Sequence, residues 1–200
     1  MEVTKIPKQY VYCLICTGFL VFLGLTIFIG HLGDDFVHIE IFRNESLPDA
    51  FINIWLGRMY SDKADHNYRP VPNTLFMLQS KLSVHPGIFH VFSALLHGFS
   101  VIMLFRFIKH LGISPDTAII TSAIFLFYPG LMGAVLWSSA QADLLVSCFI
   151  LTAAVCLLDS RRSLFLIFSC LAFLSKESSI AVIPIFILLI IERFAKGSRG

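Results

Sequence analysis

Long apolar runs that alternate with short polar segments are the main pattern of this chain. A helix needs about 20 apolar residues to cross the hydrocarbon core of a bilayer, and several runs approach that length. The last apolar region is interrupted at Ser175–Ser179. An unbroken helix would place Lys176 and Glu177 deep in lipid, so we expect two short helices that meet at this break. The pattern predicts about six membrane helices, in residues 10–32, 88–107, 115–127, 140–158 and, as two helices, 164–191.

The segment of residues 33–85 is more polar and predicts a long loop outside the membrane. Within it, Leu47-Pro48-Asp49 opens a stretch whose apolar residues recur at helical spacing as far as Tyr60. This helix either lies on the membrane surface or packs as a lid. The expected fold class is an all-α polytopic membrane protein. Residues 1–200 form one module, with a first span at 10–32, an external loop at 33–85 carrying short interfacial helices, and the remaining spans at 86–192.

The distribution of Lys and Arg indicates an orientation. Cytoplasmic segments of membrane proteins are enriched in these residues. If the N-terminus is cytoplasmic, nine of the 15 Lys and Arg residues fall in inside segments. We therefore expect an integral, multi-pass membrane protein with both termini cytoplasmic and the 33–85 loop external or luminal. The nine residues are Lys5, Lys8, Arg106, Lys109, Arg161, Arg162, Arg193, Lys196 and Arg199.

Composition narrows the class further. Hydrophobic residues make up 56% of the chain and charged residues 14%, and the mean hydropathy of +0.80 is typical of a chain whose main solvent is lipid. The net charge of +2, with no Lys/Arg tract beside aromatic residues, argues against nucleic acid as a partner. All five cysteines lie in apolar runs. Cys13 and Cys16 have no second pair of ligands, so no zinc or redox site is expected.

Two adjacent carboxylates, Asp34 and Asp35, follow the first apolar run. Ionised groups are costly in lipid, so this pair belongs at the membrane surface. A carboxylate there is a suitable general base for a hydroxyl group. The alternatives are that the pair marks the interface or caps the next helix. His31 and His38 lie four residues from these acids, but without a third ligand a divalent metal site is not favoured.

Several short motifs occur in one order along the chain. They are the Asp pair, Tyr68-Arg69-Pro70, a second span with histidines, Ala142-Asp143-Leu144-Leu145 after a proline-interrupted third span, and Ser175-Lys176-Glu177. In this order they resemble the N-terminal half of GT-C superfamily glycosyltransferases. The likeness is greatest to protein O-mannosyltransferase-like enzymes, including the transmembrane and tetratricopeptide-repeat mannosyltransferases. Each motif has only two to four residues, so their order and their spacing relative to the spans support the resemblance, from Gly30 to Ile191.

The resemblance implies an activity and a set of roles. Similar enzymes transfer a sugar from a polyprenyl-phosphate donor to an acceptor at the external face, with an acid of the first external loop as base. It implies that Asp34 or Asp35 is this base and that Arg69 and Lys176 bind the donor phosphate. It implies membrane lipids and the lipid-linked donor as partners, and no cofactor, because several relatives work without metal. Further residues expected at the same cavity are Tyr68, His97, Asp143 and Glu177.

Each of these residues also has a structural alternative. Arg69 would instead pair with a loop acid such as Asp65. Lys176 would pair with Glu177 or extend to the surface, as lysines near helix ends do. Asp143 faces either the active-site cavity or the N-terminus of the helix that it begins. The sequence leaves these alternatives open.

Two further features of the sequence can be interpreted without the resemblance. His90 and His97 are two turns apart in the second span, where hydrogen bonds between helices are expected. Asn44-Glu45-Ser46 is a glycosylation sequon in the external loop, which matters only in a eukaryotic secretory pathway.

The resembling enzymes continue for several further spans. We therefore expect this chain to be truncated at the C-terminus, or to need a partner chain that supplies the other half. The leading hypothesis is a glycosyltransferase module that uses a lipid-linked sugar and inverts the anomeric centre. The alternative from another class is a non-catalytic membrane subunit or scaffold of a glycan-assembly complex. A small transporter is less favoured, because the charges lie at one face rather than at mid-membrane.

Overall fold

A computed structural model describes residue 16, residues 19–20, 23–24 and 28–59, and residues 67–197, with side chains as far as Ile191. Over these residues the chain is all-α, as predicted. Its α-helices are α2 (Asp35–Asn44), α3 (Leu47–Trp55), α4 (Pro70–Leu82), α5 (Pro86–His110), α6 (Pro115–Phe127), α7 (Met132–Leu136), α8 (Gln141–Leu158), α9 (Arg162–Phe173) and α10 (Ile183–Gly197). Short 3-10 segments are η1 (Pro129–Leu131), η2 (Ser138–Ala140) and η3 (Glu177–Val182).

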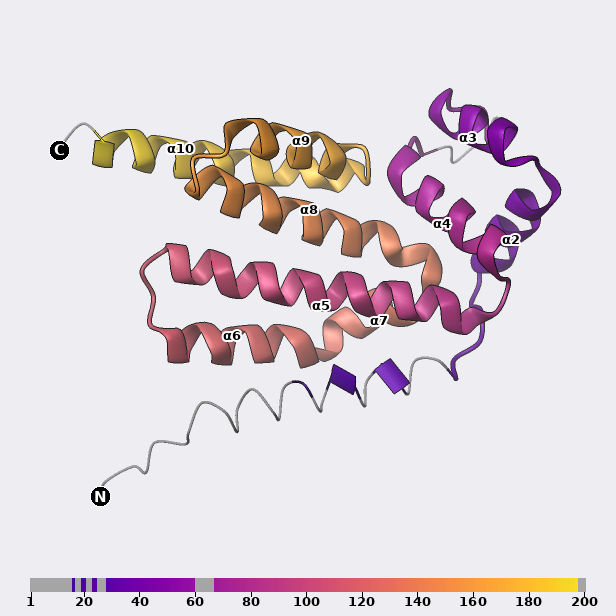
Figure 1. Cartoon of the computed structure of the whole chain (residues 1–200), viewed down its shortest axis with the longest axis horizontal. Coiled ribbons are helices and arrows are strands. Elements are labelled where there is room, and N and C mark those ends of the chain that lie inside the picture. Colours follow the sequence, from indigo (N-terminus) through magenta and orange to yellow (C-terminus); the bar gives the residue numbers. More distant parts are fainter. Residues whose placement is uncertain (1–15, 17–18, 21–22, 25–27, 60–66, 198–200) are drawn as a thin grey trace, which may run out of the picture.

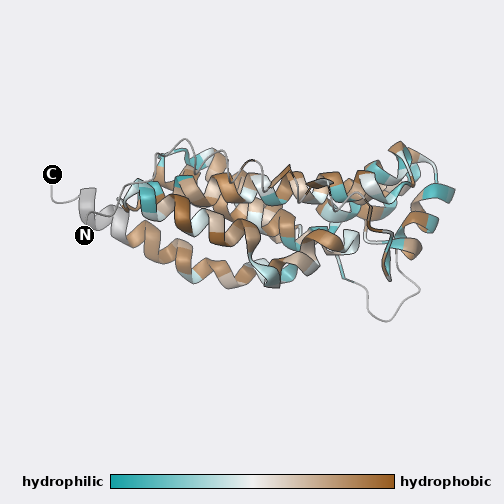
Figure 2. Cartoon of the chain, turned by 90° about the horizontal axis from the view of Figure 1, so that it is seen from below, coloured by the Kyte–Doolittle hydropathy of each residue, from teal (hydrophilic) through white to brown (hydrophobic). Residues whose placement is uncertain are grey.

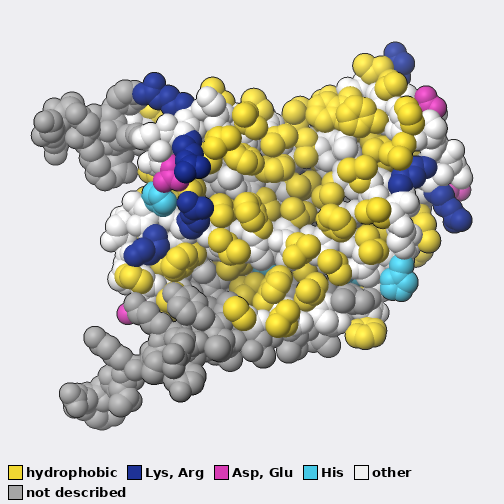
Figure 3. Space-filling view, in the orientation of Figure 1, with side chains coloured by type: hydrophobic (Ala, Val, Ile, Leu, Met, Phe, Trp, Pro, Cys, Tyr) yellow, Lys and Arg dark blue, Asp and Glu magenta, His cyan; other side chains and the backbone are white. Residues whose placement is uncertain are grey.

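Helices α5, α6, α8, α9 and α10 lie side by side along one axis, and helices α2, α3 and α4 form a cap at one end of them (Figure 1). Helix α8 packs against both α5 and α9, while α5 also packs against α6. Apolar residues dominate the long helices, and polar residues gather at the two ends (Figure 2). On the face shown in Figure 3, Lys and Arg side chains likewise lie at the ends and leave an apolar middle.

The prediction of six spans is wrong for the residues that the structure describes, where two or three helices are long and apolar enough to cross a membrane. These are α5, the continuous segment Ser138–Leu158, and a bent pair in which α6 meets η1 and α7 at 48°. Helix α9 has only 12 residues, about 18 Å at 1.5 Å per residue, against a hydrocarbon core of about 30 Å. Most of the predicted first span, 10–32, lies outside the described residues.

The two predicted interruptions of apolar runs are confirmed. Tyr128 is extended and separates α6 from η1, so the third span is interrupted just before Pro129, as predicted. In the last region α9 ends at Phe173, and the chain resumes at Glu177 as η3. The Ser175 hydroxyl donates to the Leu171 carbonyl at 2.7 Å, so this polar break provides a donor for a carbonyl group in the last turn of α9.

The loop of residues 33–85 contains more helix than predicted. The helix expected from Leu47 is α3, with the Ser46 hydroxyl accepting from the Asp49 amide as its N-terminal cap, and it ends at Trp55 rather than Tyr60. It packs on α4 through Ala50 and Ile54. Its outer side leaves apolar residues exposed, so the choice between a lid and a helix on the membrane surface stays open. The exposed residues are Leu47, Phe51, Ile52, Trp55 and Leu56.

The cap has its own apolar core, which joins it to the start of α5. Buried side chains from α2, α3, α4 and α5 pack together there: Phe42, Ala50, Ile54, Phe76, Met77 and Phe89. Buried amides tie the same region to α8, because the Gln79 amide donates to the Gln141 side-chain carbonyl at 3.0 Å. The Gln141 amide in turn donates to Ser93 of α5. The cap is therefore fixed to the bundle by both packing and hydrogen bonds.

Candidate functional site

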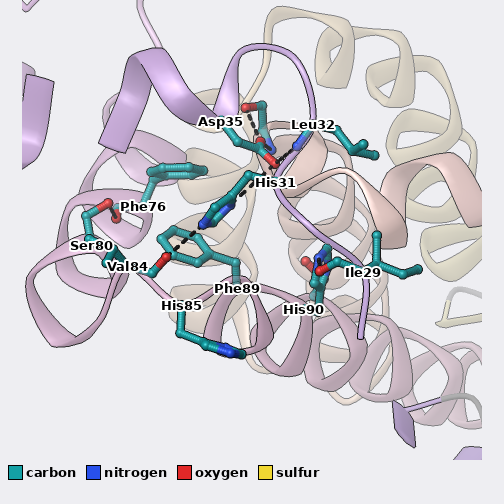
Figure 4. Close-up of polar contacts among 12 residues, drawn as sticks. Ile29, His31, Leu32, Asp35, Phe76, Ser80, Val84, His85, Phe89 and His90 are labelled. Atoms are coloured by element: carbon teal, nitrogen blue, oxygen red, sulfur yellow. Dashed lines mark hydrogen bonds and ion pairs between the residues drawn. The ribbon is translucent and has the colours of Figure 1, made fainter. Parts of the chain in front are cut away.

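Asp35 is the most firmly held of the predicted site residues. It begins α2, and its side chain is 0% exposed. One carboxylate oxygen, Oδ1, accepts from the Ser139 amide at 2.7 Å and from the Ser139 hydroxyl at 2.6 Å. The other oxygen, Oδ2, accepts from the Leu32 amide at 3.0 Å (Figure 4). Asp35 thus joins the segment before α2 to η2, 104 residues further along the chain.

His31 lies beside this carboxylate. Its Nε2 donates to the Val84 carbonyl at 2.8 Å, and its Nδ1 is 3.9 Å from Asp35 Oδ2 (Figure 4). The ring packs edge-on against Phe89, with centroids 5.2 Å apart. Its side chain is only 8% exposed, and Nδ1 is buried with no hydrogen-bond partner in the described part of the chain. Such an unpaired buried nitrogen is unusual and invites a functional explanation.

Asp34 contrasts with its neighbour. It is exposed and occupies the position before the first residue of α2. Its side chain makes no capping hydrogen bond, so the capping alternative for Asp34 is not realised here. The preceding Gly33 has φ of +50°, a left-handed conformation that glycine adopts without strain. Of the two predicted carboxylates, Asp34 is the one that a ligand at the surface can reach.

The two predicted phosphate ligands lie in adjoining ion pairs. Lys176 Nζ donates to both carboxylate oxygens of Asp143, at 2.6 and 2.8 Å. Arg69 donates through Nε at 2.9 Å and through Nη2 to the two oxygens of Glu177. The two pairs are neighbours because Lys176 and Glu177 are consecutive. The Val71 amide also donates to the Leu174 carbonyl, which joins the start of α4 to the end of α9.

The structure tests only the alternative partner suggested for Lys176. Lys176 pairs with Asp143 and not with Glu177. Asp65, the acid suggested for Arg69, lies outside the described residues. Within the described part of the chain, Arg69 pairs with Glu177 through Nε and Nη2. Both ion pairs are partly open to solvent, with side-chain exposures of 25% for Arg69 and 24% for Lys176. The role of these two cations in binding phosphate stays a prediction.

The hydrogen bonds from Arg69 lower the pKa of the Glu177 carboxyl to about 2. Because the folded-state pKa is below the ordinary value for glutamate, this pair contributes stability above that ordinary value and loses it as the pH falls toward 2. Glu177 is 59% exposed, so solvent screening keeps this contribution small. The Arg69–Glu177 pair is therefore expected to stay ionised at any physiological pH.

The remaining predicted residues have structural contacts. The Tyr68 hydroxyl donates to the Trp55 carbonyl at 3.1 Å and so ties the start of α4 to α3. His97 is 1% exposed, and its Nε2 bonds the Leu126 carbonyl at 3.0 Å, which confirms the expected hydrogen bond between helices. His90 bonds the Ile29 carbonyl at 3.1 Å, in the segment before α2. Neither histidine contacts Asp34.

Ser139 and Gln141 are functional candidates that sequence reasoning missed. Each holds a residue from another element, and neither belongs to a recognisable motif. The only signal was position, since Ser139 lies in η2 and Gln141 begins α8, both just before Asp143. Among the described residues, no three His, Cys, Asp or Glu side chains are placed to hold a metal ion. His38, suggested as a ligand with Asp34, packs against Phe76 with centroids 5.1 Å apart.

An apolar groove of about 640 Å³ lies along α5, away from the charged cluster. It is lined by residues such as Phe92, Leu95, Phe99 and Ile102, and by none of the predicted site residues. Comparison with known families, curated proteins and solved structures finds no match to this chain. A functional argument therefore depends on the motifs and on the geometry of the cluster.

Proposed function

We propose that the chain is a glycosyltransferase module of the GT-C type that uses a sugar linked to a polyprenyl phosphate. One observation supports this more than any other. The charged residues named by the resemblance come from four segments that are distant in sequence, yet two adjoining ion pairs and the Asp35–Ser139 contact gather them at the capped end of the bundle. Within this cluster, Ser139 and Asp143 are one helical turn apart.

The proposed chemistry assigns the base to Asp34. Asp34 is exposed, whereas the oxygens of Asp35 are already committed to Ser139 and Leu32. In this mechanism the acceptor hydroxyl gives its proton to the Asp34 carboxylate. The hydroxyl oxygen bonds to the anomeric carbon, and the bond from that carbon to the phosphate oxygen breaks. The electron pair leaves with the lipid phosphate, which positive charge would stabilise.

Arg69 and Lys176 are the cations proposed to meet that phosphate. Both are partly exposed and lie in consecutive ion pairs. A phosphate can share a guanidinium with a carboxylate because the planar group presents several donors. Lys176, a compact charge with three donors, has more freedom to reorient.

A non-catalytic scaffold is the second candidate, and one observation favours it. Each cation is already neutralised by a carboxylate, so the cluster is complete without a ligand. In that case the ion pairs would serve only to join α4, α8 and η3. Binding of a phosphate by Arg69 and Lys176 separates the two candidates.

Farnesyl phosphate and farnesol provide a binding test, because the two ligands differ only in the phosphate. If Lys176 contacts the phosphate, Lys176→Gln should weaken farnesyl phosphate binding by roughly 1.5–3 kcal/mol, the range for a hydrogen bond to a charged group. Farnesol binding should not change. Arg69→Lys should also weaken farnesyl phosphate, because a point charge does not reproduce the paired contacts of a guanidinium. Isothermal titration in detergent gives both affinities.

Two controls make this result specific. Lys109→Gln removes an exposed lysine from the opposite end of the bundle and should leave both affinities unchanged. Asp143→Asn combined with Lys176→Gln avoids leaving a carboxylate without its cation, and should bind as weakly as Lys176→Gln alone. Equal binding of farnesyl phosphate by the parent chain and both single variants would favour the scaffold.

We further propose that the chain is a multi-pass membrane protein with the cap external or luminal. Single cysteines at Asn44 and Arg161, in a cysteine-free background, should then react with a membrane-impermeant maleimide from opposite sides of the membrane. Both positions are exposed, and they lie in the cap and beyond the far end of α8. Labelling of both from the same side of intact cells would exclude this orientation.

A further inference from the structure

His31 combines three features that its packing does not explain. It is almost fully buried, its Nδ1 has no described hydrogen-bond partner, and this nitrogen faces a completely buried carboxylate. We propose that protonation of His31 strengthens its contact with Asp35 and thereby sets the position of Asp34. We call this contact between His31 and Asp35 the clasp. The proposal rests on the role given above to Asp34 and adds a form of regulation to it.

The hydrogen bond to Val84 fixes which nitrogen of His31 can gain a proton. A carbonyl oxygen only accepts hydrogen bonds, so Nε2 carries a hydrogen in the neutral ring. The next proton must therefore bind Nδ1. That atom is the one directed at Asp35 (Figure 4). Neutral His31 presents a lone pair to the carboxylate, whereas protonated His31 presents an N–H and a positive charge.

Protonation should therefore tighten the contact between the two side chains. The separation of 3.9 Å between Nδ1 and Oδ2 is too long for a hydrogen bond and short enough to become one after a small movement. Asp35 Oδ2 accepts only the Leu32 amide among the described donors, so it has capacity for a second. Histidine is the side chain that ordinarily changes charge between pH 5 and 8.

The turn before α2 transmits this change to Asp34. Its two ends are tied together, because the Asp35 amide donates to the Leu32 carbonyl at 3.1 Å and the Leu32 amide donates to the Asp35 side chain. Gly33 and Asp34 are the residues between them. Ser139 holds the Asp35 carboxylate from the other side. A tighter clasp therefore restricts the segment that carries the exposed Asp34 side chain.

Other titratable groups surround the clasp and define the controls. From α5, His90 bonds the Ile29 carbonyl in the same segment. In the turn between α4 and α5, His85 accepts from the Gly87 amide through Nδ1 and is exposed. On α2, His38 packs against Phe76. The residue from η2 that contacts Asp35 is Ser139, which does not titrate in this range.

Electron paramagnetic resonance of a nitroxide attached at Asp34→Cys tests the proposal without any substrate. The full chain, with its native cysteines replaced, is measured in nanodiscs at pH 8 and pH 5.5. We expect slower motion of the label at pH 5.5. This difference should be lost in His31→Gln, whose amide can still donate to Val84 but cannot titrate. It should also be lost in His31→Phe, which keeps the ring packed against Phe89 if the glutamine variant does not fold.

Matched variants assign the response to His31. His85→Asn keeps an acceptor for the Gly87 amide, and it should retain the full pH difference, as should His90→Gln. Ser139→Ala should speed the label at both pH values, and Ser139→Thr, which keeps the hydroxyl, should restore the parent motion. No pH difference in the parent, or an unchanged difference in His31→Gln or His31→Phe, would overturn the clasp. Because the measurement is not of activity, a failure of the proposed function leaves this result intact, and the reverse also holds.

Discussion

Replacing Asp34 with Asn is expected to lower sugar transfer by about two to four orders of magnitude, the usual contribution of a general base. The amide keeps the size of the side chain but cannot take the proton of the acceptor hydroxyl. Asp34 is exposed and makes no capping hydrogen bond, so the variant should fold as the parent does. Initial rates with a tritiated polyprenyl phosphomannose, measured in membranes against a hydroxyl acceptor, give the size of the loss.

Glu40→Gln is the matched control for this variant. Glu40 is an exposed acid on α2, the helix that Asp34 precedes, so its replacement removes the same charge from a nearby exposed position. The control should keep the parent rate. If Asp34→Asn is also as active as the parent, Asp34 is not the base, and the scaffold becomes the better interpretation. The donor-binding test then decides whether any phosphate site is left in the cluster.

Local patterns predicted the helix starts well, because the signals that begin a helix lie within a few residues of its first turn. Ser46 and Ser114 cap α3 and α6, and a proline follows each of them in the first turn. The number of spans was harder. Hydrophobicity measures the preference of a segment for an apolar environment, and the short α9 satisfies that preference at least in part by packing against α8.

The site shows the limit of sequence reasoning more clearly. The sequence could not choose between Asp34 and Asp35, because the difference between them comes from Ser139, whose position relative to them depends on the fold. The pairing of Lys176 was missed for a local reason. Its backbone is extended, with φ of −163° and ψ of 139°, and successive side chains on an extended backbone point to opposite sides. Lys176 and Glu177 therefore meet different partners.

The cap itself was also only partly predicted. Helical spacing identified α3. The sequence of α2 instead predicted a polar loop, because it mixes acids, bases and aromatic residues. Its place in the fold depends on Phe42, which packs against Phe76 of α4 with centroids 6.2 Å apart. Such a contact between distant segments leaves no periodic signal in the sequence.

Asp35→Ala is expected to destabilise the cap, in contrast to Asp34→Ala. Removing the buried carboxylate leaves the amides of Ser139 and Leu32 without their acceptor, at a cost of about 1–3 kcal/mol for each donor that stays buried. Asp34 is exposed, and its replacement should change the free energy of unfolding by only about 0.5 kcal/mol. Unfolding in mixed micelles with increasing SDS, followed by circular dichroism, compares the two variants.

A double-mutant cycle with Ser139→Ala shows whether the loss comes from the contact proposed. Ser139→Ala alone removes one of the three described donors to Asp35, because the Ser139 amide remains. Added to Asp35→Ala it should cost little more, so the two losses should be non-additive by about 0.5–3 kcal/mol, as for residues in direct contact. Additive losses would mean that the two side chains act independently. If Asp35→Ala proves as stable as Asp34→Ala, then Asp35 is not an anchor, and the structural ground for assigning the base to Asp34 is lost.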